Sequence, residues 1–161
     1  MAIYLDYEGI QGSVTAAGYQ GMTELRHFKF GVLRKVSMKT GEMANRERSL
    51  PVFSPVYIEK RMDTATMDLF RSSVVGSQGK RATVHFVSTG NHQLIEYMAY
   101  TLENCLISDY LIYDSEFNQV PHEKMQLSYT SLLVSHTVRG ANNQAVATQR
   151  YGYHLATATS L

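Results

Sequence analysis

The stretch Thr83-Val84-His85-Phe86-Val87 decides the fold class, because its apolar and polar side chains alternate. Val84 and Phe86 share one face of an expected strand, and His85 lies on the other face. The same alternation continues along the chain over 2–7, 24–35, 52–61, 123–138 and 147–156. Residues 93–104 and 105–113 indicate two more strands that run together almost without a turn signal. Seven or eight such strands predict a mainly β protein, an antiparallel barrel or sandwich.

One segment has a helical pattern instead. Capping residues precede it, and Met67, Phe70 and Val74 follow at helical intervals. Gly76 stands where a helix stop is expected. The pattern predicts a short helix over about 64–75 that covers one end or face of the barrel.

Composition limits the classes of function. The 161 residues carry 15 basic and 14 acidic side chains, a net charge of +1, so charge gives no support to a nucleic-acid or acidic-membrane partner. The single cysteine, Cys105, excludes an intrachain disulfide. The N-terminus does not resemble a signal peptide, and no apolar run is long enough for a membrane helix. We expect one soluble domain over 1–161, made in the cytoplasm, with no membrane insertion.

Catalytic and metal-binding motifs are not found in the sequence. It contains no Gly-x-Ser-x-Gly elbow, phosphate-cradling loop or dinucleotide fingerprint. The six histidines form no zinc-like spacing with each other or with the cysteine; they are His27, His85, His92, His122, His136 and His154. We therefore expect a protein that is not an enzyme and that uses no cofactor or metal.

The segment from about 36 to 50 is polar and has no sustained period. From Arg34 to Arg48 it holds five basic and two acidic residues. A loop of this length inside a compact domain usually indicates function or disorder. It is either a solvated hairpin tip or an arm that docks onto a neighbouring subunit. Fifteen residues extend roughly 20 Å out and back.

An ordered set of short motifs covers nearly the whole chain. They are Ile3-Tyr4-Leu5, Gly9-Ile10-Gln11-Gly12-Ser13-Val14, Glu24-Leu25, Phe30-Gly31-Val32, Phe53-Ser54-Pro55-Val56-Tyr57-Ile58-Glu59-Lys60, Asp63 to Phe70, Val84-His85-Phe86-Val87-Ser88-Thr89-Gly90, Tyr100-Thr101-Leu102-Glu103-Asn104-Cys105-Leu106-Ile107-Ser108 and Pro121-His122-Glu123-Lys124-Met125-Gln126-Leu127-Ser128-Tyr129. In this order they resemble the haemolysin-coregulated protein family, which forms the inner tube of type VI secretion systems. Beyond Gly140 the resemblance weakens.

The resemblance implies an antiparallel two-sheet β-barrel with one short helix, which assembles into a hexameric ring. Rings stack into a tube that a contracting sheath expels into a target cell, and effectors can sit in the lumen. The implied partners are copies of the chain itself and the spike, sheath and effector proteins, with no nucleic acid. The protein would leave the bacterial cytoplasm through the type VI machine, without a cleaved signal peptide.

Two kinds of contact are needed for such a tube. A closed ring requires heterologous side-by-side contacts between subunits, for which polar-face residues of the strands are candidates: His27, Lys29, Tyr57 and Glu59. Stacking requires an end-on contact, for which the extended loop offers Lys39, Glu42, Arg46, Glu47 and Arg48. Two alternatives stay open: a monomeric small-molecule or carbohydrate-binding β-barrel, and a hydrolase whose His and carboxylate residues are dispersed in sequence.

Overall fold

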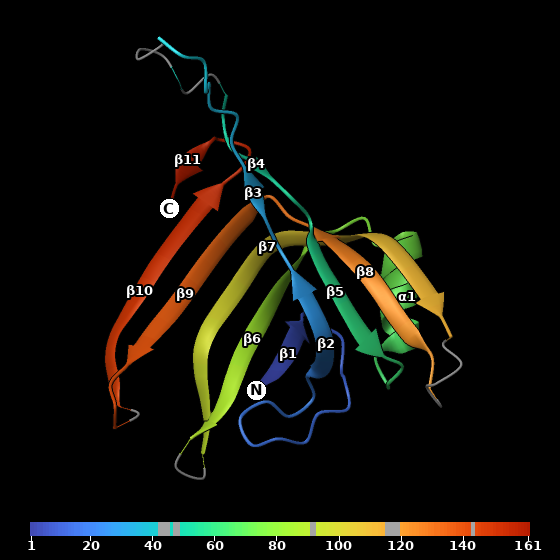
Figure 1. Cartoon of the computed structure of the whole chain (residues 1–161). Helices are drawn as coiled ribbons and strands as arrows, with labels where there is room; N and C mark the ends of the chain where they lie inside the picture. The colour runs from blue at the N-terminus through green and yellow to red at the C-terminus, as the bar shows by residue number, and fades with distance from the viewer. Residues whose placement is uncertain (42–45, 47–48, 91–92, 115–119, 143) are drawn as a thin grey trace.

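The computed structural model describes all residues except 42–45, 47–48, 91–92, 115–119 and 143. The expected mainly β fold with one short helix is confirmed (Figure 1). The strands are β1 (Ala2–Tyr7), β2 (Thr23–Lys29), β3 (Val32–Leu33), β4 (Val52–Phe53), β5 (Val56–Arg61), β6 (Lys80–Gly90), β7 (Gln93–Tyr113), β8 (His122–Ser128), β9 (Ser131–Arg139), β10 (Ala145–His154) and β11 (Thr159–Ser160). The helix expected over about 64–75 is α1 (Thr66–Val75).

Nine antiparallel strands form one sheet in the order β11-β10-β9-β7-β6-β1-β2-β5-β8. Strands β7 and β8 also pair with each other. This pairing closes the part of the sheet that runs β7-β6-β1-β2-β5-β8 into a barrel. Strands β9, β10 and β11 continue the sheet beyond the barrel (Figure 1). The two-stranded β3–β4 sheet projects from the barrel at one end.

The barrel interior is filled by the apolar side chains that the alternation places inward. Leu5 and Val84 are opposite each other in the β1–β6 ladder, and both are buried. Val56 and Leu127 are opposite each other in the β5–β8 ladder and are fully buried. Burial of this kind supplies most of the favourable free energy of folding.

The two strands expected over 93–104 and 105–113 are a single strand, β7. The expected boundary nevertheless marks a real change, since β7 pairs with β9 up to Glu103 and with β8 from Leu106. Asn104 bends the strand there with a φ of 52°, a conformation that asparagine tolerates better than most residues. The bend brings the side chain of Asn104 against Gly79. A Cβ atom added at position 79 would lie 1.8 Å from the side-chain amide oxygen of Asn104. The strand therefore continues through the boundary by bending.

Three other expected strands are each broken in two. Residues 24–35 form β2 and β3, which are separated at Phe30-Gly31. Residues 52–61 form β4 and β5, because Pro55 has no N–H to donate to a ladder. Residues 123–138 form β8 and β9, and between them Thr130 donates its N–H to the Glu103 carbonyl, 3.1 Å away.

Helix α1 packs against β7. Its buried side is formed by Thr66 and Leu69, whereas Met67, Phe70 and Val74 are exposed. Of the three residues whose spacing predicts the helix, Phe70 contacts the Tyr110 ring of β7, with centroids 5.5 Å apart, whereas Met67 and Val74 point away from the barrel. None of the helices in the described part of the chain has the length and apolar content needed to span a bilayer.

Candidate subunit interface

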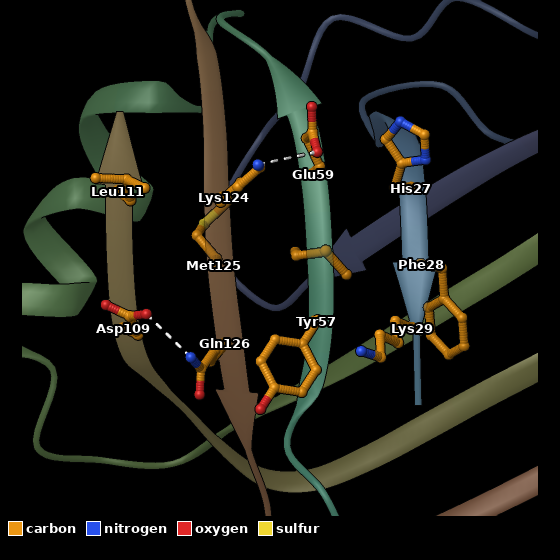
Figure 2. Close-up of a pocket in the computed structure, with 11 residues that line it drawn as sticks. His27, Phe28, Lys29, Tyr57, Glu59, Asp109, Leu111, Lys124, Met125 and Gln126 are labelled. Atoms are coloured by element: carbon orange, nitrogen blue, oxygen red, sulfur yellow. Dashed lines mark hydrogen bonds and ion pairs between the residues drawn. The ribbon is translucent and has the colours of Figure 1, made fainter. Parts of the chain in front are cut away.

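A groove of about 290 Å³ lies on the outer face of the barrel, across β2, β5, β8 and the C-terminal half of β7 (Figure 2). We call it the outer-face groove. It is lined by His27, Phe28, Lys29, Tyr57, Ile58, Glu59, Asp109, Leu111, Lys124, Met125 and Gln126. All four residues that the sequence predicts for the ring contact therefore lie in one groove.

Local backbone geometry places these side chains on the outer face. In β5 the alternation buries Val56 and Ile58 and turns Tyr57 and Glu59 outward. In β2 the register shifts between Leu25 and His27, which indicates a bulge. After the shift, His27 is opposite Glu59 and Lys29 is opposite Tyr57.

Glu59 is the electrostatic centre of one half of the groove. Its carboxylate accepts a hydrogen bond from the Tyr113 hydroxyl at 2.5 Å, lies 3.2 Å from His122 Nδ1 and lies 3.9 Å from Lys124 Nζ. Burial opposes ionisation of Glu59, but these three groups and the nearby His27 together hold the pKa of its carboxyl below the usual value. The same hydrogen bond raises the pKa of Tyr113. Glu59 is thus held as a carboxylate.

The other half of the groove mixes aromatic, amide and charged groups. Lys29 Nζ lies 5.8 Å from the centre of the Tyr57 ring, within range of a cation–π contact. Gln126 donates a hydrogen bond to Asp109 at 3.0 Å (Figure 2). An amphipathic tyrosine among satisfied polar groups is typical of protein–protein contacts. Among the described residues, no three His, Cys, Asp or Glu side chains gather as a metal site would require.

Directly behind the groove, on the inner side of the same strands, lies a buried ionic cluster of Lys60, Asp63, Thr66, Tyr110 and Glu123. The Lys60 and Glu123 side chains are 0% exposed and form an ion pair. Lys60 also pairs with Asp63 at 2.8 Å, and Thr66 donates a hydrogen bond to Glu123 at 2.9 Å. Burial and the hydrogen bond that Tyr110 donates to Glu123 raise the pKa of Tyr110. This cluster attaches the start of α1 to the barrel.

The predicted stacking residues lie in an arm, which we define as residues 32–53. Its described part is held by internal bonds: Ser37 N–H donates to the Arg46 carbonyl at 2.9 Å, and Lys35 N–H donates to the Ser49 hydroxyl at 3.1 Å. Lys39 is exposed on this arm. Three further predicted residues, Glu42, Glu47 and Arg48, lie outside the described residues.

Sequence reasoning missed part of the outer-face groove and all of the buried ionic cluster. Lys124 and Gln126 complete the groove from β8, and Asp109 and Leu111 complete it from β7. Their outward positions follow from the same alternation, but the neighbours that they meet come from the strand order. Only the structure supplies that order.

The architecture of a closed barrel with a flanking helix and a projecting arm matches solved type VI secretion proteins. A type six secretion system protein superposes with a TM-score of 0.91 at 17% identity, covering 99% of each chain. Hcp1 from Salmonella typhimurium gives a TM-score of 0.77 at 16% identity and covers 99% of this chain and 98% of its own. Secreted protein Hcp3 from Pseudomonas aeruginosa gives 0.69 at 16% identity, covering 95% of this chain and 97% of its own.

The fold is therefore that of the type VI secretion proteins. The family model described as "Type VI secretion system effector, Hcp" matches residues 4–136. The chain belongs to this Hcp family, as its sequence motifs predict, and is a tube subunit of a type VI secretion system. No curated protein matches it by sequence.

Proposed function

We propose that copies of this chain associate side by side through the outer-face groove into a closed hexameric ring, and that these rings stack into the inner tube of the secretion machine. A ring is built from heterologous contacts, in which one surface of a subunit meets a different surface of the next. The placement of His27, Lys29, Tyr57 and Glu59 in one groove is the observation that carries the proposal. Each copy would present this groove to the next.

The arm supplies the second contact, between rings. Lys39 and Arg46 belong to a segment with five basic and two acidic residues. The arm projects away from the barrel, beyond the ends of the strands (Figure 1). A projecting segment with its own internal hydrogen bonds is suited to reach a neighbouring ring.

The remaining partners and the route follow from this role. The tube would contact a spike protein and a surrounding sheath, carry effector proteins in its lumen and be expelled from the bacterial cytoplasm without a cleaved signal peptide. The chain would act as one structural domain over 1–161 and would not be an enzyme. The resemblance to the haemolysin-coregulated proteins and the family match support this role.

A small-molecule or carbohydrate-binding barrel is less well supported. The outer-face groove, at about 290 Å³, is at the lower limit of the roughly 300–1,000 Å³ of small-molecule sites. It lies outside the barrel, whose interior is filled by buried apolar side chains. A surface groove of this size suits a side chain of a neighbouring protein.

Light scattering with negative-stain imaging tests the proposal. We expect particles of six times the 18.2 kDa subunit mass, with an open centre. Tyr57→Glu should weaken the rings, because it places a charge on an aromatic contact. The concentration below which the variant rings dissociate should be about tenfold higher than that of the wild type. Thr148→Glu, an exposed change on β10, is the matched control and should leave the mass unchanged. A wild-type monomer over a wide concentration range would sink the proposal.

A further inference from the structure

His122 is a buried histidine beside the outer-face groove, and one of its two nitrogens has no partner. The residue is 8% exposed and precedes Lys124 by two positions on β8, so both side chains lie on the outer face. Its Nδ1 lies 3.2 Å from a Glu59 carboxylate oxygen. Within the described part of the chain, no group makes a hydrogen bond with its Nε2. Buried polar atoms without a partner are rare in folded proteins and call for an explanation.

The strands on both sides of β8 enclose the imidazole of His122. In the two ladders His122 is opposite Arg61 of β5 and Tyr113 of β7. The Tyr113 side chain packs against the imidazole, with ring centroids 5.6 Å apart. Beside it, Met62 donates its N–H to the Pro121 carbonyl at 3.0 Å. These contacts hold the imidazole with its Nδ1 towards the groove.

The two protonation states of His122 place different demands on this position. Glu59 is held as a carboxylate, so the Nδ1 of a neutral imidazole carries the hydrogen that Glu59 accepts, and Nε2 is a bare lone pair. A second proton would bind at Nε2 and create a buried, charged N–H there. Such a group is costly unless it finds an acceptor. The charged imidazole thus needs an acceptor that the described chain does not place at Nε2.

The charges around His122 also disfavour another cation. The titratable and charged groups that face it from its own and the neighbouring strands are Glu59, Arg61, Tyr113, Lys124 and, through Glu59, His27. Glu59 is the one carboxylate among them, and Lys124 Nζ already lies 3.9 Å from it. Arg61 is a second cation. A protonated His122 would add a third positive charge around this single carboxylate.

We propose that His122 is a pH-sensitive switch of the outer-face groove: the neutral imidazole holds Glu59 in place for the ring contact, and the protonated imidazole weakens that contact. The inference rests on the proposed ring and adds a regulation of the same site. Histidine is the side chain whose charge ordinarily changes between about pH 5 and 8. Glu59 stays charged over this range, because the pKa of its carboxyl lies below the ordinary value of 4.5. Rings should therefore be weaker in mild acid than at neutral pH.

Light scattering of a dilution series at about pH 7.5 and about pH 5.5 tests the switch. For the wild type, the concentration below which rings dissociate should be about tenfold higher at the lower pH. The amide of His122→Asn can still donate to Glu59 but takes up no proton, so the same concentration should change by less than about twofold. His27→Asn is the matched control, because His27 lines the same groove but is exposed. This control should keep the pH dependence of the wild type.

A second measurement needs no variant. Exchange of the carbon-bound imidazole hydrogen of His122 for deuterium, followed by mass spectrometry of its peptide, reports the protonation of this histidine in the assembled protein. The pH at which His122 takes up its proton should coincide with the pH at which the rings dissociate. Uptake of the proton without any change in ring mass would overturn the inference.

The other outcomes separate the switch from the ring itself. Wild-type rings that are equally or more stable at the lower pH would overturn the inference and leave the proposed function standing. An unchanged pH dependence in His122→Asn, or its loss in His27→Asn, would overturn it in the same way. A wild-type chain that forms no ring at either pH would instead refute the proposed function.

Discussion

Strands β5 and β8 carry the same pair of charges twice, once on each face of the sheet. On the inner face Lys60 is opposite Glu123, and on the outer face Glu59 is opposite Lys124. The inner pair is fully buried and in direct contact. The outer pair is separated by 3.9 Å, and the Lys124 side chain is 51% exposed.

The difference between the two pairs shows on which face the charged groups have all their partners within one chain. Removing a charge from water is costly, so a buried pair must have every hydrogen-bonding group satisfied. Inside, Thr66 and Tyr110 meet this need for Glu123. Outside, Glu59 is largely buried but Lys124 is half exposed, and an ion pair with an exposed partner contributes little to stability. The inner face thus secures the barrel, whereas the outer face is the one that the proposed ring contact would use.

The largest expected effect comes from breaking the inner pair. Lys60→Met leaves the Glu123 carboxylate buried without its cation, and we expect a loss of about 3–5 kcal/mol in the free energy of unfolding. Urea unfolding followed by circular dichroism measures the loss, since the chain has no tryptophan. Lys124→Met makes the same chemical change on the outer face and should cost less than about 1 kcal/mol.

The double variant Lys60→Met with Glu123→Met sharpens this comparison. It removes both charges and so should recover most of the stability that Lys60→Met loses. Equal losses in Lys60→Met and Lys124→Met would show that burial does not distinguish the two pairs.

The next largest effect comes from comparing two tyrosines of β7. The Tyr110 hydroxyl donates to Glu123 on the inner face, and the Tyr113 hydroxyl donates to Glu59 on the outer face. Tyr110→Phe removes the hydroxyl that donates to the buried Glu123 and leaves one carboxylate oxygen unsatisfied. We expect a loss of about 1–3 kcal/mol in the free energy of unfolding, measured by the same urea titration. A loss below the error of that titration would mean that water or another donor replaces the hydroxyl.

Much of this arrangement could be predicted from the alternation in the sequence. Lys60 follows Val56 and Ile58 in phase, and Glu123 precedes Met125 and Leu127 in phase. A charged residue in phase with a buried apolar row signals an internal ion pair. The sequence does not reveal that Lys60 and Glu123 are partners, because they lie 63 positions apart and the order of strands decides which residues meet.

The strand boundaries show the same limit. Alternation predicts where residues point, whereas pairing decides where a strand ends. Strand β7 continues through Asn104 because β6 pairs with it on both sides of the bend. The apolar stripe of α1 is a second case, since periodicity detects the stripe but does not say that Phe70 contacts Tyr110 while Met67 and Val74 stay exposed.

A smaller, pH-dependent effect is expected from Glu59→Gln. The folded pKa of Glu59 lies below its ordinary value of 4.5, so its carboxylate stabilises the fold above the unfolded pKa. That contribution is lost as pH falls through the folded pKa. Wild type should exceed Glu59→Gln in stability at pH 7, by less than about 1 kcal/mol, and the difference should be smaller at pH 3. Urea titrations at the two pH values measure it, and a difference that grows in acid would contradict the sign.

The smallest effect is expected from Tyr113→Phe. The ring stays beneath Lys124, whose Nζ lies 4.5 Å from its centre, and only the hydroxyl that donates to Glu59 is lost. His122 and Lys124 still surround the carboxylate, so the stability should change less than in Tyr110→Phe, whereas the pKa of Glu59 should rise towards 4.5. Carboxyl-carbon chemical shifts recorded across a pH titration would detect this rise. An unchanged pKa would mean that the histidine and the lysine alone hold Glu59 ionised, and that the outer face keeps its charge without the tyrosine.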